Sequence, residues 1–229
     1  MKYEWLLFDL DNTLLDFNAS EHFALTKVLD QVGVIFQPEH LTVYEKINRA
    51  CWDAFEKGTL PQSAINETRF SQFLQALGLH NEDSFEVGNY YLDQLSEKAV
   101  FMEGAQDLLE TQYQKHKLGI VTNGLKQVQR PKLVKAGLTH YFKIIVVSDE
   151  IGVSKPQVGF FDYAFREMAS PPKEKVLIIG DSINSDIKGG INYGIDTCWY
   201  NPLKKENQSE IQPVYEINSL TQLKTLKII

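Results

Sequence analysis

Short apolar runs, each followed at once by polar residues, recur along the chain. Such runs occupy about 3–9, 117–121, 144–147, 176–179 and 196–200. Runs of this length are typical of strands that are buried on both faces of a parallel sheet. Between them, apolar residues recur every three or four positions and predict helices over about 103–115, 125–136, 158–168 and 185–194. The alternation predicts an α/β fold with a Rossmann-like three-layer core and a parallel central sheet.

Residues 16–99 break this alternation. Their apolar spacing predicts four helices with no strand between them, starting at Asn18 or Ser20, at Pro38, near Ser63, and at Asp83 or Ser84. Strand-helix alternation resumes near Val100. We therefore expect an inserted all-helical cap domain over 16–99 and a core domain built from 1–15 and 100–229. A helical layer packed on the sheet is the alternative.

Polar side chains capable of chemistry follow the predicted strands. They are Asp9, Asp11, Thr122, Lys155, Asp181 and Asp186. Because parallel strands end at one edge of a sheet, where ligands bind in such folds, these residues are expected to meet. On an extended backbone Asp9 and Asp11 would share one face, and two carboxylates that close favour a bound cation such as Mg²⁺. The alternative, purely structural interpretation of these two residues is a strand that ends in an Asp-Asn turn.

Composition narrows the partners. The chain has 229 residues, 43% of them hydrophobic and 23% charged, and a net charge of −7. Its largest basic cluster is Lys204–Lys205, which argues against a nucleic-acid polymer as partner because binding a phosphate backbone needs a basic footprint. No apolar run approaches the roughly 20 residues that span a bilayer, and the first residues lack a signal-peptide pattern. Cys51 and Cys198 are expected to be reduced thiols in a cytoplasmic protein, whose oligomeric state stays open.

Four motifs appear in order along the chain. They are Asp9-Leu-Asp11-Asn-Thr13, Thr122-Asn-Gly, Lys155-Pro and Gly-Asp181-Ser-Ile-Asn-Ser-Asp186. In this combination the sequence resembles the haloacid dehalogenase superfamily of phosphohydrolases over nearly its whole length. It is more narrowly similar to the bacterial pyrimidine 5′-nucleotidase branch that clears non-canonical nucleotides. The features behind the narrower resemblance are Ile47-Asn48, Trp52, Gly58, Arg69-Phe70, Val121-Thr-Asn-Gly124 and the stretch from Asp186 to Pro202.

The resemblance implies a role for each motif residue. Asp9 would be the nucleophile that forms an aspartyl-phosphate, and Asp11 the general acid and then the general base. Thr122, with the N–H groups of Asn123 and Gly124, would bind the phosphoryl oxygens, and Lys155 would neutralise their charge. The metal would be Mg²⁺, held by Asp9, by the backbone carbonyl of Asp11 and by Asp181, with Asp186 and Ser182 as further ligands or as second-layer support.

The expected activity is Mg²⁺-dependent hydrolysis of a small phosphorylated metabolite, most directly a pyrimidine nucleoside monophosphate. Asn48, Trp52 and Arg69 are candidates for contacts with the substrate. A phosphatase for phosphosugars or phosphoglycolate, or a phosphosugar mutase, would share the same core. A haloacid dehalogenase is disfavoured by Asp11 and by the pair Asp181 and Asp186. A phospho-accepting receiver domain is disfavoured because its acidic pair precedes the phosphorylated Asp and because it has about half this length.

Overall fold

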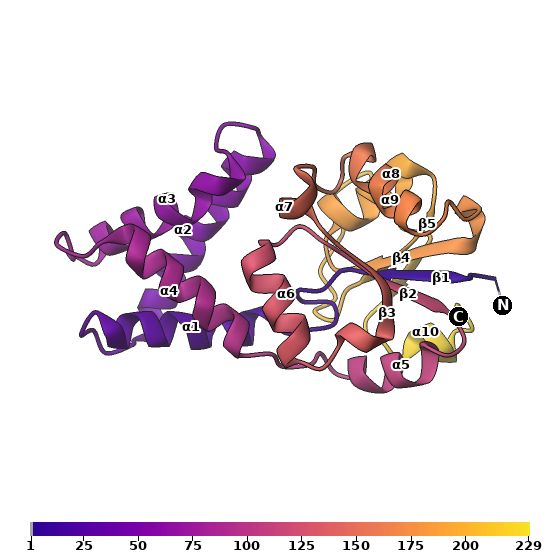
Figure 1. Cartoon of the computed structure of the whole chain (residues 1–229), viewed down its shortest axis with the longest axis horizontal. Helices are drawn as coiled ribbons and strands as arrows, with labels where there is room; N and C mark the ends of the chain where they lie inside the picture. Colours follow the sequence, from indigo (N-terminus) through magenta and orange to yellow (C-terminus); the bar gives the residue numbers. More distant parts are fainter. Residues whose placement is uncertain (1) are drawn as a thin grey trace. The chain divides into compact units, whose positions relative to one another are not determined.

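The computed structural model describes residues 2–229, which form two compact units (Figure 1). One unit is Asn18–Lys98, and the chain on either side of it forms the other. These bounds lie within two residues of the expected insert at 16–99. The first unit contains only helices among its regular elements, whereas the second holds every β-strand of the described residues.

A six-stranded parallel sheet forms the centre of the α/β unit in the part of the chain that the structure describes. The strands are β1 (Trp5–Phe8), β2 (Lys117–Thr122), β3 (Phe142–Val147), β4 (Val176–Gly180), β5 (Asp196–Tyr200) and β6 (Tyr215–Ile217). Their order is β3-β2-β1-β4-β5-β6, which confirms the predicted parallel sheet. The strand order reverses direction at β1, so the crevice beside this strand is where a doubly wound sheet binds its ligand.

Helices cover both faces of the sheet (Figure 1). Alternate side chains of each strand point to opposite faces, so each face has its own apolar core. Leu6 and Phe8 of β1 pack in one core cluster, and Trp5 and Leu7 pack in the other. The first cluster includes residues of α5 (Ala105–Gln112), α6 (Lys126–Lys135) and α10 (Gln222–Thr225). The second includes residues of α8 (Val158–Glu167) and α9 (Lys188–Tyr193). The three-layer α/β core is therefore confirmed.

The other unit consists mainly of four helices and is called the four-helix unit below. They are α1 (Phe17–Gln31), α2 (Pro38–Glu56), α3 (Gln62–Ala76) and α4 (Ser84–Glu97). Its core is aromatic, with Tyr44, Phe70, Phe73 and Tyr91 fully buried. Asp83 caps α4 as expected, since its carboxylate accepts hydrogen bonds from two backbone N–H groups of the first turn.

Three local expectations need correction. Helix α1 begins at Phe17, ahead of the predicted Asn18 or Ser20, and the hydroxyl of Ser20 instead donates to the carbonyl of Lys98 at 2.7 Å. Strand β3 begins at Phe142, two residues early, and leads directly into a short helix, α7 (Ser148–Ile151). The helix expected from about Ser185 starts as a π-helical turn over Ile183–Ile187.

Among the described residues, no helix is both long and apolar enough to cross a membrane.

Candidate active site

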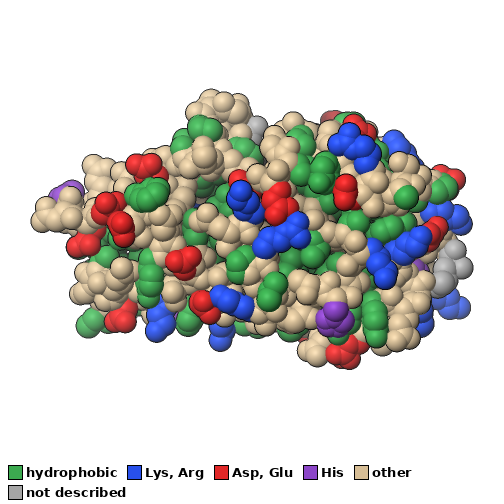
Figure 2. All heavy atoms as spheres, viewed as in Figure 1, with side chains coloured by type: hydrophobic (Ala, Val, Ile, Leu, Met, Phe, Trp, Pro, Cys, Tyr) green, Lys and Arg blue, Asp and Glu red, His purple; other side chains and the backbone are tan. Residues whose placement is uncertain are grey.

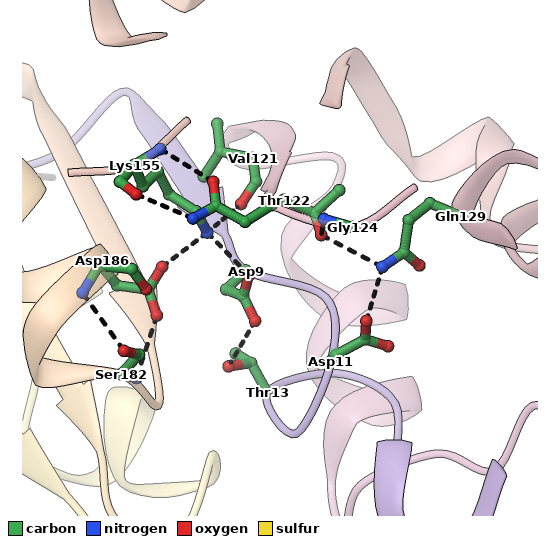
Figure 3. Close-up of polar contacts among 12 residues, drawn as sticks. Asp9, Asp11, Thr13, Val121, Thr122, Gly124, Gln129, Lys155, Ser182 and Asp186 are labelled. Carbon is green, nitrogen blue, oxygen red and sulfur yellow. Dashed lines mark hydrogen bonds and ion pairs between the residues drawn. The ribbon is translucent and has the colours of Figure 1, made fainter. Parts of the chain in front are cut away.

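The carboxyl ends of β1, β2 and β4 gather the predicted chemical groups (Figure 3). Phe8 of β1 pairs in register with Ile120 of β2 and with Ile179 of β4, so the three strands end at nearly the same level. Asp9 follows β1, Thr122 is the last residue of β2, and Asp181 follows β4. Asp186 comes from the π-helical turn that follows. The sheet edge therefore brings together residues that are up to 177 positions apart in the sequence.

Lys155 is the buried cation of the site, and its side chain is 1% exposed. Its Nζ donates to Asp9 Oδ1 at 2.8 Å, to Asp186 Oδ1 at 2.6 Å and to the carbonyl of Val121 at 2.6 Å. These bonds use all three donors of the ammonium group. Burial by itself would lower the pKa of Lys155, but the negative charges of Asp186 and Asp9 outweigh it and raise this pKa. The charge on Lys155 is thus fixed against the nucleophile candidate.

The side chain of Asn123 holds the backbone of Lys155. Its Oδ1 accepts from the N–H of Lys155 at 2.8 Å, and its Nδ2 donates to the carbonyl of Lys155 at 2.9 Å. The sequence places Asn123 in a phosphate-binding turn, through its backbone. The structure adds a second use, in which the amide ties the end of β2 to the loop that carries the lysine.

Three carboxylates, those of Asp9, Asp181 and Asp186, offer oxygens within 4.8 Å of one another. Burial, together with the charge of Asp186, raises the pKa of Asp181 to about 7. Burial also raises the pKa of Asp9 well above its usual range, although Lys155 opposes this shift. Three carboxylates facing one lysine leave an excess of negative charge, which a cation would relieve. A set of hard oxygen donors fits Mg²⁺, so the residues present suit the metal that the sequence implies.

Asp186 is fixed by the chain around it. Its Oδ2 accepts from the N–H of Ser182 at 3.1 Å, and its Oδ1 accepts from Lys155. A Cβ at Gly180 would lie 2.3 Å from the carboxyl carbon of Asp186, so a side chain at position 180 would displace it. The hydroxyl of Ser182 accepts from the N–H of Ser185 at 3.3 Å and caps the π-helical turn.

The carboxylate of Asp11 has partners different from those of Asp9. Its Oδ2 accepts from Gln129 Nε2 at 2.6 Å, and its Oδ1 accepts from Lys132 Nζ at 3.0 Å (Figure 3 shows the contact with Gln129). That Asp9 and Asp11 share one face of an extended backbone stays a prediction. The chain turns after Asp11, where Asn12 has a φ of 59°. The backbone carbonyl of Asp11 stays a predicted metal ligand.

Sequence reasoning missed Gln129 and Lys132. Both lie on α6 and are buried, with exposures of 1% and 0%. The available signal was their position on the helix stripe that also carries Val128 and Leu133, which are buried too. Polar residues on a short helix are usually solvated, so the stripe alone did not identify them.

The predicted substrate contacts Asn48, Trp52 and Arg69 lie in the four-helix unit. Arg69 is 3% exposed, and its guanidinium donates to Asn48 Oδ1 and to Asn66 Oδ1, each at 2.9 Å. Asn48 in turn donates to Glu21 Oε1 at 3.1 Å. Trp52 is half-buried and packs edge-on against another aromatic ring of α2. Arg69 is therefore engaged inside its own unit, whereas Asn48 and Trp52 retain some exposed surface.

The fold and the strand-end site together define a class of protein. Residues 6–200 match the haloacid dehalogenase-like hydrolase family, and the chain belongs to that family. The predicted superfamily is thereby confirmed, as is the prediction of an enzyme at the level of a hydrolase.

Two curated relatives cover nearly the full length. The chain is 38% identical over 224 residues to the pyrimidine 5′-nucleotidase PynA of Streptococcus pneumoniae, with 97% of this chain and 94% of PynA covered. It is 32% identical over 226 residues to the pyrimidine 5′-nucleotidase YjjG of Escherichia coli, with 99% and 98% covered. Among solved structures, the HAD hydrolase YfnB of Bacillus subtilis, bound to magnesium and described as revealing interdomain movement, matches with a TM-score of 0.93 and 38% identity over 100% of both chains.

Proposed function

We propose that this hydrolase is a Mg²⁺-dependent phosphomonoesterase that works through an aspartyl-phosphate on Asp9 and acts on pyrimidine nucleoside monophosphates. The observation that carries the proposal is the environment of the Asp9 carboxylate. Its Oδ1 is held by Lys155 at 2.8 Å, whereas its Oδ2 has only a 3.5 Å contact with Thr13 among the described residues. One oxygen is anchored to a buried cation, and the other is available to attack.

In the first step, Asp9 Oδ2 bonds to phosphorus while the bond between phosphorus and the ester oxygen breaks. Asp11 gives its proton to the departing alkoxide, which leaves as the nucleoside. The hydroxyl of Thr122 donates to a phosphoryl oxygen, and Lys155 balances the charge that gathers beside Asp9. The side chain of Asp11 is 24% exposed, so the leaving group and the attacking water can reach it.

In the second step, a water molecule attacks the phosphorus of the aspartyl-phosphate. Asp11, now a carboxylate, removes a proton from that water as the new bond forms. The bond between phosphorus and Asp9 Oδ2 breaks, and inorganic phosphate leaves. The sum is one ester and one water converted into one alcohol and one phosphate, with Asp9 and Asp11 restored.

Asp9, Asp181 and Asp186 are the side chains that would hold Mg²⁺, supported by the carbonyl of Asp11. The raised pKa values of Asp9 and Asp181 support this assignment, because they arise from burial and from neighbouring negative charge. When bound, the ion would neutralise the carboxylates and stabilise charge on the phosphoryl oxygens.

The substrate class is supported by the relatives named pyrimidine 5′-nucleotidases. We assign the four-helix unit the role of a cap that shields the phosphoryl-enzyme from bulk water. Asn48 and Trp52 are its proposed substrate contacts, and Arg69 acts by holding the amide of Asn48 in place. A reducing, cytoplasmic setting is part of the proposal, and the free, buried thiols Cys51 and Cys198 support it.

The test is phosphate release from a matched panel of uridine, thymidine, cytidine and adenosine monophosphates, sugar phosphates and phosphoglycolate. Each substrate is assayed with Mg²⁺ and with a chelator, and Asp9→Asn serves as the blank. We expect the fastest release from pyrimidine monophosphates and loss of release with the chelator. Faster release from a sugar phosphate or phosphoglycolate would replace the substrate class, and isomerised sugar phosphate without free phosphate would indicate a mutase. Absence of release from the whole panel by folded protein would overturn the proposed function.

A further inference from the structure

Helix α6 presents two buried polar side chains, Gln129 and Lys132, to the end of β1. Burying polar groups is unfavourable unless they are bonded, and a short amphipathic helix would normally place apolar residues at such positions. Both side chains donate to Asp11, one to each carboxylate oxygen, at 2.6 Å and 3.0 Å. The carboxylate is therefore held at two points, and its plane and direction are fixed.

Gln129 also reaches Thr122. Its Nε2 lies 3.3 Å from Thr122 Oγ1, and the N–H of Gly124 donates to the same oxygen at 3.2 Å (Figure 3). A hydroxyl oxygen accepts two hydrogen bonds and donates one. With both acceptor positions taken, Thr122 has its O–H left to offer, and that proton is directed away from Gln129 and Gly124. A phosphoryl oxygen requires such an oriented donor.

The neighbouring glycine makes room for this arrangement. A Cβ at Gly124 would lie 2.0 Å from Gln129 Nε2. Only glycine at this position lets the amide of Gln129 lie between Asp11 and Thr122. The same arrangement leaves Gln129 Oε1 buried without a hydrogen-bond partner among the described residues. An amide placed for stability alone would not leave its carbonyl oxygen unpaired.

We propose that Gln129 is a positioning residue, which with Lys132 fixes the carboxylate of Asp11 and orients the hydroxyl of Thr122 for phosphoryl transfer. The inference rests on the proposed function, because it assigns Gln129 to the residues that would act on the leaving group and on the phosphoryl oxygens. Gln129 itself touches neither substrate nor metal; it acts through its two neighbours.

The test variant is Gln129→Met, which keeps the size of the side chain and removes its donor and its unpaired oxygen. We expect kcat for uridine monophosphate to fall at least about tenfold, with KM within about twofold of wild type, because the lost interactions serve the transition state. We expect the melting temperature not to fall, because an unpaired buried oxygen is removed. A purely structural glutamine would lose stability and activity together.

Gln112→Met is the matched control. Gln112 is also buried on a core helix, 3% exposed, and its amide donates to a neighbouring threonine hydroxyl of the same helix. This variant should keep the wild-type kcat. Gln129→Glu is the second variant, used in case Gln129→Met does not fold. It has the same shape but sets a carboxylate against Asp11, so kcat should fall further than in Gln129→Met.

Wild-type protein measured in the same assay separates this proposal from the proposed function. Active wild type with an unchanged kcat in the folded Gln129 variants would overturn the positioning role and leave the phosphatase standing. A lower kcat that is accompanied by a lower melting temperature would also overturn it. Wild type that releases no phosphate would overturn the proposed function, and the positioning role with it.

Discussion

Two of the buried polar clusters among the described residues, each built around a cation, differ in charge. The strand-end cluster of the α/β unit sets Lys155 against the carboxylates of Asp9, Asp181 and Asp186. The arginine cluster of the four-helix unit sets Arg69 against the neutral amides of Asn48 and Asn66, with aromatic rings over its guanidinium. Glu21, which accepts from Asn48, supplies one negative charge.

The difference shows that burial of a charged side chain does not by itself mark a reactive site. The strand-end cluster carries more negative than positive charge and raises the pKa of two of its acids, which are typical properties of sites that bind a metal and react. The arginine cluster is balanced, and the hydrogen bonds described above hold its members together. We therefore interpret Arg69 as a residue that serves packing and Lys155 as a residue that serves the reaction.

The largest effect that would separate the two clusters is expected for Asp9→Asn. An amide cannot form the aspartyl-phosphate, so kcat should fall by about 10⁴-fold or more. The fold should persist, because one of three mutually repelling carboxylates becomes neutral. Steady-state phosphate release and a thermal melt measure the two quantities. Asp107→Asn, an exposed change on α5, is the control and should retain activity. Near-normal turnover in Asp9→Asn would remove Asp9 as the nucleophile.

The next effect contrasts the two cations directly. Lys155→Met leaves buried carboxylates without their ammonium partner, which should cost about 3–5 kcal/mol of unfolding free energy at neutral pH. It should also lower kcat by about 10²–10³-fold. Arg69→Met should cost about 1–3 kcal/mol, because two part-buried amide oxygens lose their donor. Its kcat should stay within about threefold, since no contact of the reacting groups is removed.

Denaturant unfolding and phosphate release on both variants provide the comparison. The contrast between the clusters fails if Arg69→Met loses kcat as severely as Lys155→Met. It also fails if both variants lose stability and neither loses kcat.

The smallest effect is a pH dependence of stability in chelator. The pKa of Asp181 is about 7 in the folded protein, against 3.8 for the ordinary group, so the native state binds the extra proton between these values. The contribution of this group to the free energy of unfolding therefore falls as pH rises from about 4 to 7. Above pH 7 the full cost of burying the charged carboxylate is present. Asp181→Asn removes this penalty. The free energy of unfolding of the variant should therefore exceed that of wild type by on the order of 1–3 kcal/mol at pH 7.5 and equal it at pH 4.

Thermal melts across this pH range measure the difference. Adding Mg²⁺ should stabilise wild type more than Asp181→Asn, since a ligand oxygen has been removed. A variant less stable than wild type at pH 7.5 in chelator would mean that burial and the charge of Asp186 do not raise the pKa of Asp181.

The sequence supports the prediction of the strand-end residues because their position depends on one regular feature. Each apolar run ends in the residue that reaches the sheet edge, and parallel strands in register bring those ends together. Asp9, Thr122 and Asp181 follow from this rule alone. The four helices of Asn18–Lys98 follow from their apolar spacing, and Asp83 from its capping chemistry.

Other features depend on tertiary packing that no local pattern encodes. Gln129 and Lys132 face Asp11 because α6 packs on the sheet with its polar stripe inward, whereas polar helix residues usually face water. The contacts of Asp11 with Gln129 and Lys132 join residues that are 118 and 121 positions apart in the sequence. The burial of Arg69 depends on the neighbouring helices α2 and α4, which spacing along α3 does not show.

The central claim is that Asp9 carries the phosphoryl group during turnover. Wild-type enzyme turning over uridine monophosphate is quenched rapidly in acid, reduced with borohydride and mapped by peptide mass spectrometry. Borohydride converts an aspartyl-phosphate into the corresponding alcohol and leaves a free carboxylate unchanged. The mechanism predicts that the reduced residue is Asp9 and that it is absent from Asp9→Asn and from enzyme without substrate. Rapid turnover with Asp9 unmodified, or with the label on another residue, would contradict it.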